Sequence, residues 1–286
     1  MKIKYLLKLL RVNHWVKNLF IFLPAFFAGK ILESFNLDVI LTLCAFCLAS
    51  SSVYILNDWM DISKDRLHPD KKHRPLASGV VSKQTAIFVI TILLLLFSIC
   101  LFHISAWVPI LTYFVMNVFY SLKLKQISII DIIIISLGFV LRVVAGALSY
   151  HVFISEWMII MVFLLSLFMA LGKRRSDLIL DLSAEELRPS LKGYNLPLVD
   201  SFITMTLTTI LISYIMYSIS SDVTKRMGSD KIYYTSIFVI MGLFRYVQIV
   251  LVDKKSSSPV AVLWKDRFIQ VTLLLWILSF VYIIYI

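Results

Sequence analysis

Residues 38–57 read DVILTLCAFCLASSSVYILN and pass directly into residues 57–74, which read NDWMDISKDRLHPDKKHR. The first stretch is apolar and long enough, at about 1.5 Å rise per residue, to cross a hydrocarbon core of roughly 30 Å as a helix. The second stretch crowds carboxylates and cations together at the point where that helix leaves the membrane. The junction predicts a helical membrane protein with its chemistry at one membrane face.

The composition extends this prediction to the whole chain of 286 residues, of which 60% are hydrophobic and 16% are charged, with a mean hydropathy of +0.89. Such a chain belongs to the polytopic membrane class. We expect an all-α bundle of nine transmembrane helices that forms a single membrane-embedded domain over residues 1–286. His103 and the stretch 105–109 indicate a break inside the apolar run 84–121. The expected spans are 18–35, 38–57, 84–105, 106–121, 128–150, 156–171, 199–220, 232–251 and 268–286.

The lysines and arginines predict the orientation of the bundle. Most of the 28 fall at the N-terminus and in alternate loops, and positive charge near span ends accumulates on the cytoplasmic side. We expect a multi-pass membrane protein with its N-terminus and charged loops on the cytoplasmic side and its C-terminus outside; the bacterial inner (plasma) membrane is what the family resemblance described below implies. The net charge of +11 follows from this topology and from contact with anionic lipid, so nucleic acid is not an expected partner.

Three segments stand out from the apolar spans. Residues 1–15 have basic residues on one face and leucines on another, which is typical of an interfacial amphipathic helix. Residues 58–83 and 172–197 are long and charged, and both are expected in the cytoplasm. They are the candidate active-site loops.

Four side chains at the membrane exit are spaced for one helical face. If the helix continues through them, Asn57, Asp58, Asp61 and Asp65 lie within an arc of roughly 100°. Carboxylates so placed repel one another unless they share a cation, and hard oxygen ligands of this kind suit Mg²⁺, which also takes substrate phosphates as ligands. The alternative is a solvated polar loop, which explains the charge but not the spacing. The spacing favours a Mg²⁺ site with the three aspartates as catalytic residues.

Cations follow these carboxylates at Arg66, Lys71, Lys72 and Arg74. A metal held by carboxylates and flanked by Lys and Arg side chains is the usual arrangement for activating a diphosphate leaving group. The pattern indicates an enzyme that releases diphosphate.

A second charged stretch, GKRRSDLILD (172–181), follows the sixth expected span. It places Asp177 and Asp181 one helical turn apart, directly after Lys173 and Arg174, on the same membrane face as the first cluster. The two carboxylates are candidates for a second Mg²⁺ site, and the cations are candidates for phosphate contacts. The alternative is a charged helix end in water.

Arg142 lies deep in an expected span, within GFVLRVVAG (138–146). An intramembrane arginine normally faces the bundle interior and needs a partner. Asp131 is roughly 16 Å away along the helix axis, which is too far for a direct ion pair. This leaves an anionic ligand or a carboxylate of another helix as the expected partner.

These motifs resemble the UbiA superfamily of intramembrane prenyltransferases. The run from Asn57 to Pro75, N-D-x-x-D-x-x-x-D-x-x-H-P-x-K-x-x-R-P, is similar to the first aspartate-rich motif of that superfamily. The stretches RVNHWVKN (11–18), GFVLR (138–142) and GKR (172–174) look most like its decaprenyl-phosphate 5-phosphoribosyltransferase branch.

The resemblance implies that phosphoribosyl pyrophosphate is the donor, that a polyprenyl phosphate lipid is the acceptor and that Mg²⁺ is required. The side chains implied to contact substrate or phosphate are Lys17, Asn18, Arg66, Lys71, Arg74, Tyr120, Lys125, Arg142, Lys173 and Arg174. The implied metal ligands are Asn57, Asp58, Asp61, Asp65, Asp177 and Asp181. The segment DLILD (177–181) is reduced relative to the second motif of aromatic prenyltransferases, so the last two roles stay open.

Two other functions are compatible with parts of the pattern. A UbiA-type prenyltransferase would move a polyprenyl group from its diphosphate to an aromatic acceptor, and would consume prenyl diphosphate. A transporter could bind an anion at Arg142, but it would release no diphosphate and would leave the aspartate spacing unexplained.

Overall fold

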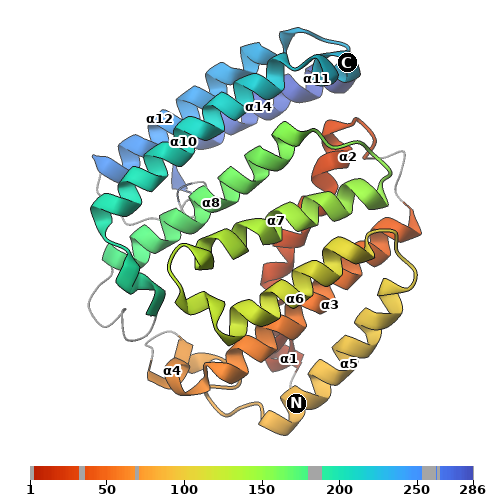
Figure 1. The fold of residues 1–286 in the computed structure, drawn as a ribbon, viewed down its shortest axis with the longest axis vertical. Coiled ribbons are helices and arrows are strands. Elements are labelled where there is room, and N and C mark those ends of the chain that lie inside the picture. Colours follow the sequence, from red (N-terminus) through yellow and green to blue (C-terminus); the bar gives the residue numbers. More distant parts are fainter. Residues whose placement is uncertain are drawn as a thin grey trace. The chain divides into compact units, whose positions relative to one another are not determined.

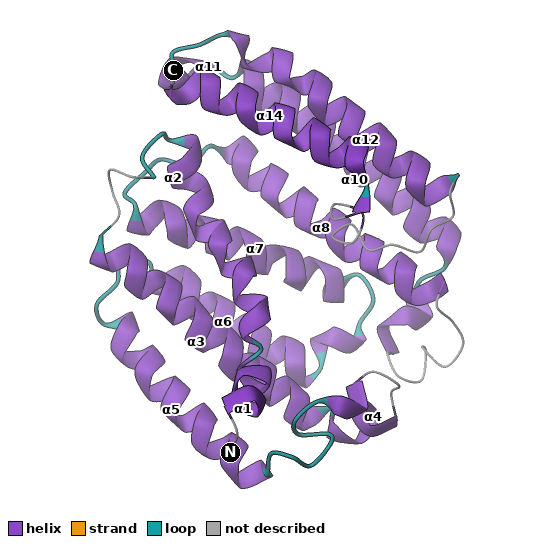
Figure 2. Ribbon diagram, turned by 180° about the vertical axis from the view of Figure 1, so that it is seen from behind, coloured by secondary structure: helices purple, strands orange, loops and turns teal. Residues whose placement is uncertain are grey.

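The computed structural model describes residues 3–31, 36–67, 71–179, 189–252, 262 and 265–285, and Figure 1 follows the chain as a ribbon. Within these ranges every regular element is a helix, as Figure 2 shows. In chain order, with η for a 3₁₀ helix, the elements are α1 (Ile3–Leu10), η1 (Val12–Phe22), α2 (Leu23–Phe27), α3 (Leu37–Met60), α4 (Ile62–Leu67), η2 (Lys71–His73), α5 (Lys83–Leu101), α6 (Trp107–Leu122), η3 (Leu124–Gln126), α7 (Ile130–Ser149), α8 (Glu156–Ile179), η4 (Pro189–Gly193), α10 (Leu196–Ile219), α11 (Ser221–Met227), η5 (Lys231–Thr235), α12 (Ser236–Leu251) and α14 (Arg267–Tyr285).

Six helices in the described ranges are long and apolar enough to cross a membrane. They are α3, α5, α7, α8, α10 and the continuous stretch Lys231–Val250, and each coincides with an expected span. The apolar helices Trp107–Leu122 and Arg267–Ile283 coincide with two more expected spans but are shorter. The all-α class is therefore confirmed for the described residues, whereas the count of nine spanning helices is not.

The expected break inside the run 84–121 is confirmed, because α5 ends at Leu101 and α6 begins at Trp107. The turn between them is held by Asp38 in the first turn of α3, which accepts the Ser105 hydroxyl at 2.5 Å and the Ser105 backbone N–H at 3.2 Å. The two apolar helices are therefore separate elements.

The first expected span, 18–35, is not a single α-helix. Its described part consists of the 3₁₀ helix η1 and the short helix α2, and residues 32–35 lie outside the described ranges. The backbone of η1 lies directly against α7, since a Cβ placed on Gly146 would come within 2.0 Å of the Ile21 carbonyl oxygen. Pro24 in the first turn of α2 then favours a fresh helix start. A 3₁₀ helix in close backbone contact with α7 thus stands where hydropathy alone predicts a regular helix.

The chain divides into two compact units, each described here by itself. Unit 1 comprises residues 1–26, 30–134 and 141–153, and unit 2 comprises residues 27–29, 135–140 and 154–286. In unit 1, α3 packs against α1, η1, α5 and α6 (Figure 1). Buried Ile21, Phe46, Ile110 and Tyr113 belong to one core cluster, to which η1, α3 and α6 contribute. In unit 2, α10 packs against α8 and α12, and α12 packs against α14. The single domain stays a prediction.

Two expected boundaries are wrong. The amphipathic helix predicted over 1–15 ends at Leu10, because Arg11 adopts a left-handed backbone conformation (φ 51°, ψ 47°) that starts η1. The loop predicted over 172–197 begins later, because α8 continues to Ile179 and carries Lys173, Arg174 and Asp177 on its last turns. Residues 180–188 of that loop lie outside the described ranges.

Candidate active site

The end of α3 brings together the residues that we call the carboxylate cluster, namely Asn57, Asp58, Asp61 and Asp65. The helix does not run through unbroken, because α3 ends at Met60 and α4 begins at Ile62. Two backbone hydrogen bonds nevertheless carry the helical spacing across the junction: Asp61 N–H donates to Asn57 O at 3.0 Å, and Asp65 N–H donates to Asp61 O at 2.8 Å. The side chains therefore keep the grouping that the sequence spacing predicts.

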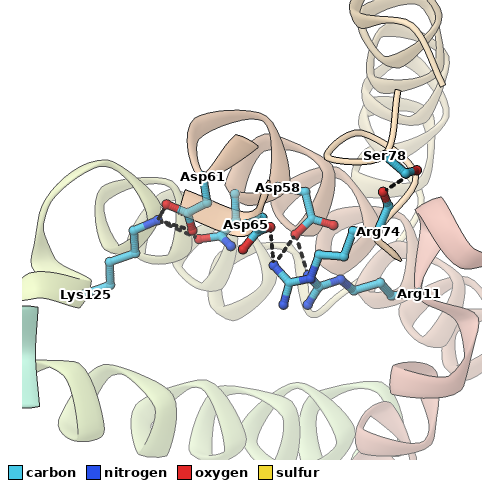
Figure 3. Close-up of polar contacts among 8 residues, drawn as sticks. Arg11, Asp58, Asp61, Asp65, Arg74, Ser78 and Lys125 are labelled. Carbon is cyan, nitrogen blue, oxygen red and sulfur yellow. Dashed lines mark hydrogen bonds and ion pairs between the residues drawn. The ribbon is translucent and has the colours of Figure 1, made fainter. Parts of the chain in front are cut away.

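Arg74 joins two members of this cluster (Figure 3). A single nitrogen, Nη1, donates to Asp58 Oδ1 at 3.1 Å and to Asp65 Oδ2 at 2.7 Å. Arg11 Nη2 also donates to Asp58 Oδ1. The two aspartates are 2% and 3% exposed, and a charge so deeply buried is tolerated when a partner of opposite charge lies beside it. The arginines supply that charge.

Lys125 joins the other two members. Its ammonium lies 2.7 Å from both carboxylate oxygens of Asp61 and 3.1 Å from Asn57 Oδ1. Lys125 reaches them from η3, the short turn between α6 and α7. All four members of the carboxylate cluster are therefore bonded to Arg11, Arg74 or Lys125.

The loop that carries Arg74 is fixed to α4. Arg66 Nε donates to the Ala77 carbonyl oxygen at 3.1 Å, and Ser78 donates to the Arg74 carbonyl oxygen from both its backbone N–H and its hydroxyl. Gly79 follows with a φ of 76°, which favours glycine. The predicted phosphate contact Arg66 thus holds the loop backbone, while Lys71 is half-buried at the start of η2.

The donor set of the carboxylate cluster fits a hard divalent cation. It offers carboxylate and amide oxygens, which are the ligands that such an ion prefers. Arg74 Nη1 contacts both Asp58 and Asp65, so a single positive charge can already bind two of these carboxylates at once. In the described part of the chain, no three His, Cys, Asp or Glu side chains are arranged closely enough to ligate one ion. Ligation by this cluster therefore requires the carboxylates to close around an ion and the cations to move aside.

A second polar group, which we call the Arg142 cluster, comprises Arg142, Asn18, Tyr113 and Phe46. Arg142 Nε donates to Asn18 Oδ1 at 2.8 Å, and Nη2 donates to the Tyr113 hydroxyl at 2.9 Å. Its guanidinium carbon lies 4.5 Å from the ring centre of Tyr113 and 5.6 Å from that of Phe46. Asn18, Tyr113 and Phe46 are therefore among the groups that hold Arg142, and the anionic ligand or carboxylate that the sequence suggests as its partner stays a prediction.

The N-terminal motif places further charge beside the Arg142 cluster. The Arg11 guanidinium carbon lies 4.9 Å from the Tyr54 ring centre, and the His14 ring contacts the same tyrosine edge-on at 5.2 Å. Lys17 is solvent-accessible, yet desolvation by the surrounding protein lowers its pKa, and the nearby charge of Arg142 lowers it further. Tyr120 is half-buried and close enough to Tyr54 for the two hydroxyls to interact electrostatically.

The second charged stretch belongs to unit 2. Arg174 is fully buried and donates to Asp177 Oδ2 at 3.3 Å, while Lys173 is exposed. Arg175 Nε donates to Asp200 Oδ1 at 2.6 Å, which ties α8 to the first turns of α10. Asp181 lies outside the described residues.

Three of these contacts involve residues that the sequence analysis did not select. Arg11 could have been found, because it opens the motif RVNHWVKN. Tyr113 is a polar aromatic inside an apolar helix, the kind of partner that a buried arginine requires. Asp200 gives no local signal, since its partner is 25 residues away in sequence.

The helices and the carboxylate cluster define a multi-pass membrane protein with paired carboxylates and cations at the end of a spanning helix. Residues 18–278 match the UbiA prenyltransferase family, and the chain belongs to that family of enzymes. The resemblance seen in the motifs is therefore confirmed.

Relatives and solved structures agree with this membership. The decaprenyl-phosphate phosphoribosyltransferase of Mycolicibacterium smegmatis is 30% identical over 95% of this chain and 90% of its own length. The protein of the same name from Corynebacterium glutamicum is 29% identical over 98% of this chain and 87% of its own length. The structure of a UbiA homolog from Archaeoglobus fulgidus bound to DMAPP and Mg²⁺ superimposes with a TM-score of 0.73 at 18% identity, covering 99% of each chain. The fold is UbiA-like.

Proposed function

We propose that this enzyme moves 5-phosphoribose from phosphoribosyl pyrophosphate to a polyprenyl (decaprenyl-type) phosphate and releases diphosphate. The observation that carries the proposal is the meeting of three aspartates with Arg11, Arg74 and Lys125 at one end of α3. Such a site can hold a metal and the phosphate oxygens of a diphosphate together. The relatives named decaprenyl-phosphate phosphoribosyltransferase favour this reaction over prenyl transfer to an aromatic acceptor.

The carboxylate cluster is the proposed Mg²⁺ site. Its oxygens would hold the ion, which, when bound, stabilises the negative charge that builds up on the leaving diphosphate. Asp177 and Asp181 are proposed as further ligands. Within the carboxylate cluster, Asp58 lies on α3 and Asp65 on α4, and Asp61 lies at the junction between the two helices.

The cations are the proposed phosphate contacts. Lys17 and Arg142 add positive charge to that of Arg11, Arg74 and Lys125, and Asn18 accepts a hydrogen bond from Arg142; this fits a substrate pair with phosphate groups beyond the diphosphate. The other proposed contacts are Arg66, Lys71, Arg74, Tyr120, Lys125, Lys173 and Arg174. The acceptor phosphate oxygen would bond to the anomeric carbon as the carbon–oxygen bond to diphosphate breaks. No strong base is needed, because a phosphate monoester is already an anion.

The proposed setting is the bacterial inner membrane, with nine spanning helices in a single domain and the active site on the cytoplasmic side. The N-terminus would lie inside and the C-terminus outside. Cysteines introduced at Lys72 and Ser229 test this orientation in whole cells against a background without Cys44, Cys47 and Cys100. A membrane-impermeant thiol reagent should label the cysteine at 229 and spare the one at 72. The opposite labelling would contradict the orientation.

The reaction is tested by following ribose-labelled phosphoribosyl pyrophosphate into lipid. Detergent-purified protein with Mg²⁺ and polyprenyl phosphate should move the label into the organic phase, and omission of the acceptor should prevent this. A different result would assign the enzyme to prenyl transfer: the ribose label stays in the aqueous phase, and in a second assay the enzyme consumes a prenyl diphosphate in the presence of an aromatic acid.

A further inference from the structure

Each member of the carboxylate cluster is already bonded, through at least one of its oxygens, to a positively charged side chain of the same protein. Arg74 lies between Asp58 and Asp65, and Lys125 lies between Asn57 and Asp61. A Mg²⁺ ion held by these side chains at roughly 2.0–2.1 Å would place its charge beside the guanidinium and the ammonium, so it competes with both cations for the same carboxylates.

The competition makes binding of the metal alone unfavourable. An ion that entered the cluster would displace a guanidinium or an ammonium that is 26% or 16% exposed, leaving a poorly solvated charge without its partner. Phosphate oxygens of a donor would give the displaced cations new negatively charged partners in place of the carboxylates. The metal and the donor should therefore each raise the affinity of the site for the other, since coupling between two ligands is reciprocal.

The backbone suits such an exchange. The acidic side chains stand on α3 and α4 or at their junction, whereas the three cations come from a short 3₁₀ helix and from residues between helices. Arg74 follows the short turn η2, and Lys125 lies in η3. Arg11 is the left-handed residue between α1 and η1. Long side chains on such segments can change partners while the helices stay in place.

We propose that Arg11, Arg74 and Lys125 hold the carboxylate cluster in the free enzyme and move to the donor's phosphate oxygens when metal and donor bind together. This inference rests on the proposed function, and it adds Arg11 to the residues that contact the donor. It also predicts that removal of a cation strengthens binding of the metal alone and weakens binding of the donor.

Mn²⁺ is the probe, and its binding to detergent-purified protein without any donor is measured by electron paramagnetic resonance. Arg74→Met should bind Mn²⁺ roughly tenfold more tightly than the wild type, within the usual range of coupling between two ligands. Lys72→Met is the control, since it removes the same charge from an exposed side chain two residues away. The control should match the wild type.

The same pair of measurements can be made at Lys125, in case Arg74→Met does not fold. Lys125→Met should also bind Mn²⁺ more tightly, whereas exposed Lys123→Met should match the wild type. With phosphoribosyl pyrophosphate present, both site variants should bind Mn²⁺ more weakly than the wild type does. Both should also bind the donor more weakly than their control variants do.

Equal or weaker Mn²⁺ binding by both site variants would overturn the exchange and would mean that the cations only organise the carboxylates. The donor-free comparison contains no phosphoribosyl group, so its failure leaves the donor assignment standing. Conversely, tighter Mn²⁺ binding by the variants together with no binding of phosphoribosyl pyrophosphate would support the exchange and contradict the proposed donor.

Discussion

The Lys125 ammonium lies 2.7 Å from both carboxylate oxygens of Asp61, a residue 64 positions earlier in the chain. The contact joins the turn after α6 to the junction between α3 and α4. It shows that the cations of the site are gathered from distant segments of unit 1, while the carboxylates come from one continuous stretch.

Alanine at Asp58 or at Asp61 should nearly abolish turnover. Each change removes a proposed metal ligand and leaves a basic partner uncompensated, so we expect a loss of roughly 100-fold or more in diphosphate release. Asp38→Asn is the control, because this carboxylate lies at the other end of α3 and bonds to Ser105. Activity of either alanine variant equal to that of the control would rule out the metal assignment.

Tyr113→Phe should weaken the Arg142 cluster without changing its volume. The change deprives a buried guanidinium N–H of its acceptor, which costs about 1–3 kcal/mol, and should lower both the melting temperature and substrate affinity. Tyr150→Phe is the control, since the Tyr150 hydroxyl is buried without a hydrogen-bond partner among the described residues. If the two variants melt at the same temperature, the Tyr113 hydroxyl does not hold Arg142.

Loss of the Lys17 proton at high pH should lower the activity of the enzyme. Its pKa is lowered from 10.5 by desolvation and by the Arg142 charge, so the free enzyme loses this cation at a lower pH than an ordinary lysine would. Donor kcat/KM should fall as pH rises through that pKa, and Lys17→Arg should move the fall to higher pH. If donor kcat/KM falls over the same alkaline pH range in Lys17→Arg as in the wild type, Lys17 does not bind the donor.

Lys17 should affect folding stability in the opposite direction: activity is expected to fall with rising pH, whereas stability is expected to rise. The unfolded chain binds more protons at Lys17 than the folded chain does, between the lowered pKa and 10.5. Stability of the ligand-free protein should therefore rise with pH across that window, and Lys17→Met should flatten the rise. Melting temperatures of the two proteins, compared at several pH values, check the slope.

Gly146→Ala should destabilise unit 1. The new Cβ would lie 2.0 Å from the Ile21 carbonyl oxygen, and no rotation of a side chain can relieve a clash with backbone. We expect a cost of about 3 kcal/mol and displacement of η1, which carries Asn18 to Arg142.

Gly242→Ala is the control variant for the Gly146→Ala experiment. A Cβ there meets only the Thr272 methyl at 4.0 Å, an ordinary contact. Its melting temperature should equal or exceed that of the wild type, since alanine favours the helix. Equal melting temperatures for the two alanine variants would show that η1 does not pack on α7 as described.

The sequence predicted what depends on local spacing. The helices α3, α5, α8 and α10, the break after Leu101 and the grouping of Asp58 with Asp65 all follow from hydropathy and the 3.6-residue period. Only the junction at Asp61 interrupts that period, and the backbone hydrogen bonds across it keep the side chains together.

What the sequence could not predict depends on packing between distant segments. The pairs Arg11–Asp58 and Lys125–Asp61 join residues 47 and 64 positions apart, and no periodicity specifies them. The 3₁₀ helix η1 packs closely against Gly146, and hydropathy does not report this contact. The Arg142 cluster likewise needed the fold to bring Asn18 and Tyr113 together.

The most direct test is diphosphate release by the detergent-purified protein with Mg²⁺, measured for two substrate pairs. Phosphoribosyl pyrophosphate with polyprenyl phosphate should release diphosphate, and a prenyl diphosphate with an aromatic acid should not. Release from the second pair alone would contradict the account and would make the enzyme an aromatic prenyltransferase.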